Sequence, residues 1–306
     1  MSSEHDRVRD DARFEELPNH PIEHQRLWTP WRMRYVGGGA KEAGCLFCNR
    51  LAASDDVQSL IVHRGESAFL IMNLFPYNTG HLMIVPNEHV ASPEAASEAA
   101  IQGMAALLPP TLRALRRVLT CDGFNVGFNI GDVAGAGVAG HLHQHIVPRW
   151  KGDANFMPIL ASTMVLPELI PVTYAKVRAE VARELAHEGD KAATIRLVIL
   201  SEDGAAVAIE DRAEGSALPV ARAEATEPLW KAAVRHAASL GVTTEIAGWA
   251  GSRRAQPGGQ PAMALRALAP VEGSGQPNFA PVTEAERRLT DERDKEALSA
   301  ARALLG

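Results

Sequence analysis

The sequence has little cysteine and no long apolar segment. It contains three cysteines in 306 residues, and two of them form the pair Cys45-x-x-Cys48. This is too few for the disulfide framework of a small secreted domain. No apolar run approaches the roughly 18 residues of a membrane-spanning helix, and the charged residues 1–16 lack the apolar core of a secretory signal. We therefore expect a cytoplasmic protein with no membrane partner.

An excess of positive charge is also absent. The formal net charge is -6, which argues against a broad surface for nucleic acid or anionic lipid. Hydrophobic residues make up 46% and charged residues 22%, as in ordinary globular proteins. The length of 306 residues allows two domains, each with its own core.

Three histidines stand at alternate positions in the segment GHLHQHIVPRW: His141, His143 and His145. Side chains of a β-strand alternate between its two faces, so this spacing predicts all three imidazoles on one face. Imidazole can act as a nucleophile, move protons or bind metal near neutral pH. A chance cluster or a purely structural metal site is the alternative explanation.

The pattern around these histidines predicts an antiparallel α+β fold. Residues 67–72 and 82–85 are apolar and predict a hairpin around the turn at residues 76–80. Ser92-Pro93-Glu94 is typical of a helix start, and Pro109-Pro110 is expected to interrupt that helix before a second one at residues 111–119. Strands are expected over residues 124–130 and 141–147.

The second half of the chain predicts a smaller α/β domain. After an amphipathic helix over residues 167–187, the pattern restarts with strands at 194–200, 205–209, 244–250 and 262–268 and helices at 227–240 and 284–305. We therefore expect a disordered tail at residues 1–24, a first domain at 25–189 and a second at 190–306.

Residues 72–89 (MNLFPYNTGHLMIVPNEH), the glycine-rich run 135–140 and the three histidines together resemble the histidine-triad (HIT) superfamily of nucleotidyl hydrolases and transferases. The resemblance covers about residues 25–160. The segments LWTPWRMRYV and HLHQHIVPRWKGDANFMP are most similar to the branch that cleaves diadenosine tetraphosphate by phosphorolysis or hydrolysis. The resemblance to the HIT superfamily implies an α+β fold with a HIT-like antiparallel sheet and helices.

The resemblance also implies roles for particular residues. His143 would attack the α-phosphorus of a nucleotide and form a covalent nucleotidyl-histidine, while His145 and Asn129 would contact the phosphate or the leaving group. Further nucleotide or phosphate contacts are implied for Asn73, Asn78, Gly135, Gly137 and Trp150. The glycine run carries no Ser, Thr or Gln where many relatives have one, so phosphate binding there would depend on backbone N–H groups or on another group.

A metal site is a separate expectation. A Cys-x-x-Cys pair is compatible with Zn²⁺ or with redox chemistry. By resemblance to HIT proteins, His89 and His141 would be the two further metal ligands beside Cys45 and Cys48. His81 is the alternative to His89. Such a Cys2His2 set has no open position and predicts structural zinc.

Several functions stay open at this point. The first is a nucleotidyl hydrolase or transferase acting on diadenosine polyphosphates, with water or inorganic phosphate as acceptor. The alternatives are a hydrolase of adenosine phosphoramidates or aminoacyl-adenylates, and a non-catalytic nucleotide sensor. The resemblance also implies a homodimer, unless the second domain replaces or blocks that interface.

Residues 217–242 faintly resemble a Nudix motif region, although the glutamates that hold divalent metal there are missing. We therefore expect either a Nudix-like domain without its catalytic glutamates or an unrelated α/β domain.

Overall fold

The computed structural model describes residues 43–135, 137–153, 168–186, 194–255, 260–271 and 278–305. The tail predicted at residues 1–24 and the tryptophan segment LWTPWRMRYV lie outside these ranges. The domain boundary predicted at residue 190 falls within residues 187–193, which are also outside them. Among the helices of the described ranges, none is long and apolar enough to cross a bilayer.

The first sheet is antiparallel, as predicted. Its five strands lie in the order β1 (Ile61–Arg64), β2 (Ala68–Met72), β3 (Leu82–Pro86), β5 (Gln144–Arg149) and β4 (Gly123–Phe128). Strands β2 and β3 are buried throughout because both faces of the sheet are covered. Leu70 and Ile84 pack in the core under helix α4 (Glu98–Leu119), while Phe69 and Val85 pack with Phe47 of helix α2 (Leu46–Ala52).

Helix α4 differs from the sequence prediction at its start and at its centre. Residues 93–95 form only a 3₁₀ turn (η2), and the helix begins after Ser97, whose hydroxyl accepts a hydrogen bond from the N–H of Ala100. The helix then continues through Pro109 and Pro110 to Leu119. Pro110 is buried together with its neighbours on the core face, so packing outweighs the backbone hydrogen bonds that the two prolines remove.

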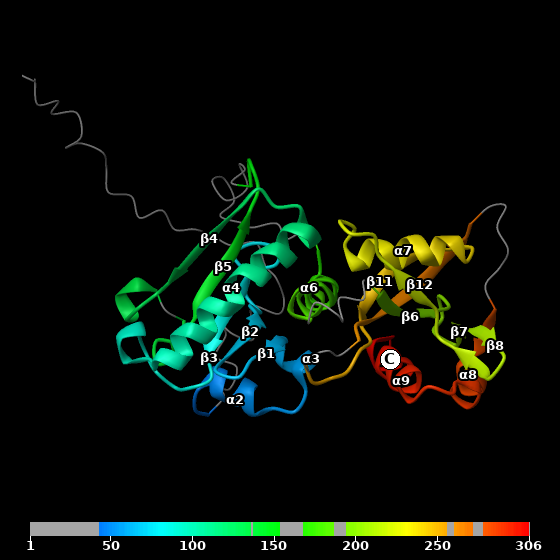
Figure 1. The fold of residues 1–306 in the computed structure, drawn as a ribbon, viewed down its shortest axis with the longest axis horizontal. Helices are drawn as coiled ribbons and strands as arrows, with labels where there is room; N and C mark the ends of the chain where they lie inside the picture. Colours follow the sequence, from blue (N-terminus) through cyan, green and yellow to red (C-terminus); the bar gives the residue numbers. More distant parts are fainter. Residues whose placement is uncertain are drawn as a thin grey trace, which may run out of the picture.

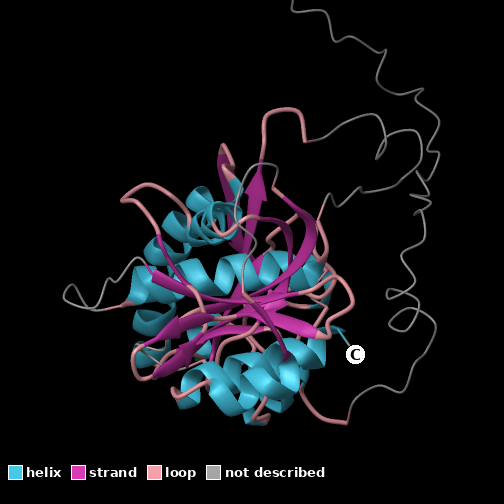
Figure 2. Cartoon of the chain, turned by 90° about the vertical axis from the view of Figure 1, so that its right-hand side faces the viewer, coloured by secondary structure: helices cyan, strands magenta, loops and turns pink. Residues whose placement is uncertain are grey.

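The second sheet is mixed and lies C-terminal to the first. Its path is β11 (Val242–Trp249), β12 (Ala262–Pro270), β6 (Thr194–Leu200), β7 (Ala206–Ala208) and β13 (Phe279–Pro281), with β10 (Val220–Arg222) also paired to β6. Strands β8 (Glu210–Arg212) and β9 (Gly215–Ala217) form a separate hairpin. Helices α6 (Ile170–Leu185) and α7 (Leu229–Ser239) pack with one face of the sheet, and α8 (Val282–Arg288) and α9 (Glu292–Leu305) pack with the other (Figures 1 and 2).

The single terminal helix predicted over residues 284–305 is two helices. The break falls at residues 289–291, where the carboxylate of Asp291 accepts a hydrogen bond from the N–H of Arg293 and so caps α9.

Helix α6 lies between the two sheets (Figure 1). It contacts α4 and β1 on one side and α7 and β11 on the other. Buried residues of both sheets, such as Leu70 and Leu197, therefore belong to one continuous hydrophobic cluster that runs through α6. The helix thus supplies a cluster that the two sheets share, beside the separate clusters of each sheet; the division into two domains stays a prediction.

Buried hydrogen bonds also connect α6 to the elements on both of its sides. The carboxylate of Glu180 on α6 is fully buried, and it accepts hydrogen bonds from Arg117 of α4 and from the N–H of Leu229 at the start of α7. Arg178 is also buried, and it donates to Tyr174 Oη and to the carbonyl of Ser252.

Candidate active site and metal centre

The three alternate histidines are only partly on a strand. Strand β5 begins at Gln144, so His145 lies on it, whereas His141 and His143 precede it. The N–H of Leu142 is bonded to the carbonyl of Val90 instead of to a neighbouring strand. The imidazoles still lie side by side: the ring centroids of His143 and His145 are 4.8 Å apart. His141 turns toward the two cysteines.

The main chain fixes the tautomer of His143. Its Nδ1 atom lies 2.8 Å from the carbonyl oxygen of His141. A carbonyl can only accept a hydrogen bond, so Nδ1 carries the proton and Nε2 keeps a free lone pair. Burial lowers the pKa of His143, which keeps this lone pair available near neutral pH. The Nε2 atom therefore has the free lone pair that a nucleophile requires.

A second chain of hydrogen bonds fixes the tautomer of His145. The N–H of Tyr77 donates to Nδ1 of His81 at 3.0 Å, so the proton of His81 is on Nε2. That Nε2 lies 2.9 Å from Nδ1 of His145 and donates to it. His145 consequently carries its own proton on Nε2 and presents an N–H donor.

Burial keeps this pair of histidines neutral. It lowers the pKa of His81 to about 3, with further contributions from His145 and His143. Burial, together with His143, lowers the pKa of His145 to about 4. At neutral pH the site therefore combines one imidazole lone pair with one neutral imidazole donor.

Tyr77 and Asn129 border His145. The ring of Tyr77 stacks on His145 with a centroid distance of 5.9 Å. The amide nitrogen of Asn129 lies 3.5 Å from Nε2 of His145, on the open side of the imidazole, where the sequence predicted a phosphate contact.

The glycine run forms turns next to the histidines. Gly131 and Gly135 have φ values of +78° and +77°, a backbone conformation that glycine adopts most readily. Gly135 and Gly137 are exposed, while Val138 packs against the apolar cluster around Phe47. This loop thus ends close to the histidines, as its place in the sequence indicated.

The other predicted contact residues have protein partners. Asn73 bonds the N–H of Phe75 and lies 3.3 Å from Nδ1 of His81. Asn78 donates to the carbonyl of Pro148 and to Asp153, so its amide holds the turn against the end of β5. The backbone of Trp150 also bonds Asp153, and its ring is half-buried. The nucleotide contacts of these residues stay predictions.

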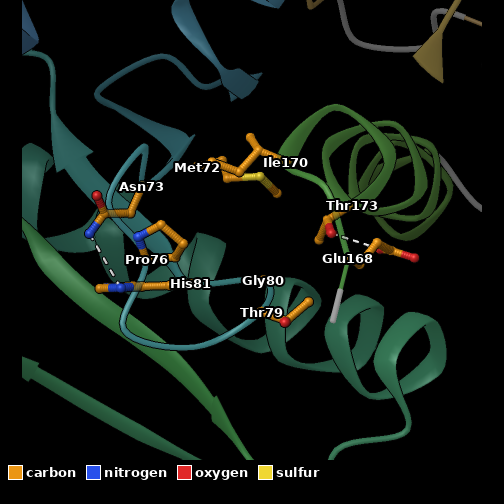
Figure 3. A pocket seen from close by; sticks show the side chains of 9 residues that line it. All are labelled: Met72, Asn73, Pro76, Thr79, Gly80, His81, Glu168, Ile170 and Thr173. Atoms are coloured by element: carbon orange, nitrogen blue, oxygen red, sulfur yellow. Dashed lines mark hydrogen bonds between the residues drawn. The ribbon is translucent and has the colours of Figure 1, made fainter. Parts of the chain in front are cut away.

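A small recess lies on the other side of His81 (Figure 3). Its walls come from the turn before β3 and from the start of α6, where Glu168 accepts a hydrogen bond from Thr173. His81 lines this recess, whereas His143 and His145 are not among its lining residues.

The four predicted metal ligands come together. Their ligand atoms all lie within 4.8 Å of one another. Cys45 is the N-cap of α2, Cys48 lies one turn later, His89 follows β3, and His141 precedes β5. His81 is not in this group, because it faces His145.

The distances fit a tetrahedral zinc ion. Two nitrogen ligands of zinc are about 3.3 Å apart and a sulfur–nitrogen pair about 3.6 Å, given the usual bond lengths. Here the Nδ1 atoms of His89 and His141 are 3.2 Å apart, and Sγ of Cys48 lies 3.4 Å from Nδ1 of His89 and 3.6 Å from Nδ1 of His141. Nε2 of His141 donates to the carbonyl of Pro86 at 3.0 Å, which leaves Nδ1 free to bind metal. The donor set and its spacing therefore fit structural zinc.

Comparisons with known proteins place this site in a family. The HIT domain model matches residues 54–152. The AP-4-A phosphorylase of Mycobacterium tuberculosis is 36% identical over 167 residues, which are 52% of this chain and 86% of that protein. The chain belongs to the HIT family. The Bacillus subtilis protein named "Protein hit" is 33% identical over 111 residues, or 36% of this chain and 74% of its own length.

Solved structures were also compared. The match to a zinc-bound histidine triad family protein from Mycobacterium smegmatis covers 46% of this chain and 94% of that protein, with 27% identity and a TM-score of 0.38. The HIT domain model ends at residue 152, so the Nudix-like resemblance of residues 217–242, which form β10, α7 and the start of β11, stays a prediction.

His81 and Tyr77 lie at the site, although the sequence predicts no role in it for Tyr77 and only an alternative metal ligand in His81. The place of His81 in GHLMIVP, directly before a strand of the histidine sheet, is the signal that could identify it. Tyr77 acts through its backbone N–H, which donates to His81, and through ring stacking on His145. No residue pattern reveals such contacts.

Proposed function

We propose that this HIT protein transfers an adenylyl group from diadenosine tetraphosphate to inorganic phosphate, giving ADP and ATP. The observation that carries the proposal is the pairing of a free Nε2 lone pair on His143 with an Nε2–H donor on His145, both fixed by hydrogen bonds that end on the main chain. The similarity to a protein named AP-4-A phosphorylase supports the choice of substrate and acceptor.

The first step forms a bond from His143 Nε2 to the α-phosphorus and breaks the bond from that phosphorus to the bridging oxygen. The electron pair of the broken bond leaves with ATP. His145 offers its Nε2–H to the leaving oxygen as a hydrogen bond. A neutral donor suits a polyphosphate, which departs as a stable anion, better than an amine, which needs a full proton.

The second step reverses the geometry with a new nucleophile. An oxygen of inorganic phosphate attacks the α-phosphorus, the phosphorus–Nε2 bond breaks, and its electron pair returns to His143. The product is ADP, and the imidazole regains its neutral Nδ1–H tautomer. Splitting one displacement into two in this way predicts ping-pong kinetics.

Zinc held by Cys45, Cys48, His89 and His141 would be a structural ion in this scheme. It would tie helix α2 to the segment that leads into β5. Phe47 lies within this helix, and its ring centroid is 5.0 Å from that of His143. The metal site therefore stabilises the position of the nucleophile and takes no part in the bond changes.

The test is to incubate the purified protein with diadenosine tetraphosphate, with and without inorganic phosphate, and to separate the nucleotides by ion exchange. The proposal expects ADP and ATP only when phosphate is present. AMP and ATP without phosphate would indicate an asymmetric hydrolase and contradict the choice of acceptor. No product under either condition would contradict the proposal as a whole and favour phosphoramidate substrates or a nucleotide sensor.

A further inference from the structure

A glycine lies directly opposite His145 in the sheet. Gly127 of β4 pairs with His145 of β5, and residues opposed in an antiparallel pair point to the same face. Their Cβ positions would be about 5 Å apart. Asn125 and Asn129, two residues away on either side, point to this face as well. On the other side of β5, Met83 of β3 pairs with His145, so a side chain is missing only at the β4 position opposite the proposed hydrogen-bond donor.

The protein itself does not require glycine at this position. A Cβ built on Gly127 would meet no atom within 4 Å in the described part of the chain, and its φ is not among the positive values. Glycine weakens a strand, and it often marks a place where a ligand approaches closely. Gly127 is exposed on the edge strand β4, so a ligand can reach the space beside His145 from solvent.

The other sides of His145 are occupied. His81 is bonded to Nδ1, the ring of Tyr77 stacks on one face, and the His143 ring stands against it edge-on. Nε2 is thus approached from the side of Asn129 and Gly127. This is also the side on which the leaving oxygen must lie to accept the hydrogen bond from Nε2–H.

We propose that Gly127 is a specificity-determining residue that leaves room for a bulky nucleoside polyphosphate leaving group beside His145. The inference rests on the proposed function and deepens it. It separates two parts of the substrate: the adenylyl group, which His143 attacks, and the departing ATP, which passes over Gly127. A side chain at residue 127 should hinder the second part and leave the first unaffected.

The experiment compares wild type with Gly127→Ala and Gly127→Val. Gly123→Ala is the matched control, because Gly123 lies on the same strand and face, also has no atom within 4 Å of an added Cβ, and pairs with Arg149 instead of a histidine. Two quantities are measured in one assay: kcat/KM for diadenosine tetraphosphate, and the inhibition constant of AMP, which carries no leaving group. Thermal unfolding is followed in parallel.

The expected result is a fall in kcat/KM of roughly tenfold for the alanine variant and more for valine, since a misplaced methyl group in a binding site costs about this much. The inhibition constant of AMP and the activity of Gly123→Ala should stay within about twofold of wild type. The melting temperature should stay level or rise, because these residues favour strands more than glycine does.

Three outcomes would overturn the inference: unchanged kcat/KM in both Gly127 variants, an equal loss of AMP binding, or a loss of activity that follows a lower melting temperature. If wild type itself does not cleave diadenosine tetraphosphate with or without phosphate, the proposed function fails first and the inference falls with it.

Discussion

The Nδ1 atom of His143 lies 2.8 Å from the carbonyl oxygen of His141, so the backbone of one histidine sets the proton position of the other. His141 in turn uses its Nε2 atom to donate to the carbonyl of Pro86 and leaves Nδ1 facing the cysteines. Two histidines only two residues apart thus present different ring nitrogens: Nε2 of His143 is free for the proposed attack on phosphorus, and Nδ1 of His141 faces the candidate metal ligands.

Replacing the nucleophile should abolish turnover. We expect His143→Ala to lower kcat for diadenosine tetraphosphate by at least about a thousandfold, because no other group can form the covalent intermediate. Wild type incubated with substrate and then denatured at alkaline pH, where a phosphorus–nitrogen bond to histidine survives, should carry one adenylyl group, visible by mass spectrometry. The variant should carry none. Residual activity above a tenth of wild type, with an unchanged circular dichroism spectrum, would refute the role of His143.

Removing the donor to His145 should slow the reaction without stopping it. In His81→Gln the Nε2–H that fixes the tautomer of His145 is lost, and we expect kcat to fall about tenfold to a hundredfold and the pH profile to change shape. His63→Gln is the control, because His63 is a largely buried histidine with a lowered pKa on β1, in another part of the same sheet. Equal losses in the two variants would indicate a general effect on folding.

The zinc site should contribute to stability. We expect the purified protein to hold one zinc ion, and Cys48→Ser to lose most of it and to melt more than about 5 °C lower. Cys121→Ser is the matched control, since Cys121 is a buried free thiol outside the metal cluster. Full zinc content in Cys48→Ser, measured by plasma mass spectrometry, would exclude Cys48 as a ligand.

Stability should fall on acidification from about pH 6.5. His81 has a folded-state pKa of about 3, well below its unfolded value of about 6.5. The unfolded state therefore binds more protons between these values, and stability is retained above pH 6.5 and lost as the pH falls toward 3. The loss attributable to His81 is at most about 1.4 kcal/mol per pH unit.

The pH effect of His81 can be isolated by comparison. Urea unfolding at pH 7.0 and pH 5.0 should show a smaller difference in His81→Gln than in wild type, while the protonation of the zinc ligands affects both proteins alike. Equal differences in the two proteins would show that His81 does not carry the effect.

The buried carboxylate on α6 should be important for the junction between the sheets. Glu180→Gln removes the charge that Arg117 faces and should lower the free energy of unfolding by about 3 kcal/mol. Glu184→Gln should cost less, because Glu184 is more exposed and pairs with the exposed Arg113 as well as with Arg117. Chemical denaturation of both variants distinguishes them; equal losses would argue against a special place for Glu180.

Much of the first sheet was predictable, because its signals are local. The apolar runs of β2 and β3 and the turn between them depend on neighbouring residues, and both strands lie where the sequence indicated. The continuity of helix α4 through Pro109 and Pro110 was not predictable, because the burial of Pro110 is a tertiary effect that outweighs the local preference of proline.

The candidate site likewise has features that the sequence predicts and features that depend on tertiary structure. The residue types of the metal cluster and of the three histidines were readable from the sequence. The start of β5 at Gln144 was not, because it depends on which neighbouring backbone groups lie within reach. The tautomers of His143 and His145 depend on the carbonyl of His141 and on the N–H of Tyr77, and every residue type has such groups.

Helix α6 has a consequence for the order in which this protein is made. Its residues leave the ribosome before any strand of the second sheet, yet Tyr174, Val177 and Val181 belong to the cluster that joins both sheets. Until residues 194–305 have been synthesised, the side of this helix that packs on α7 and β11 has no counterpart. We therefore expect the histidine sheet to reach its final packing only late in synthesis, and a chain truncated after residue 190 and released from the ribosome to be a preferred client of chaperones that bind exposed apolar helices.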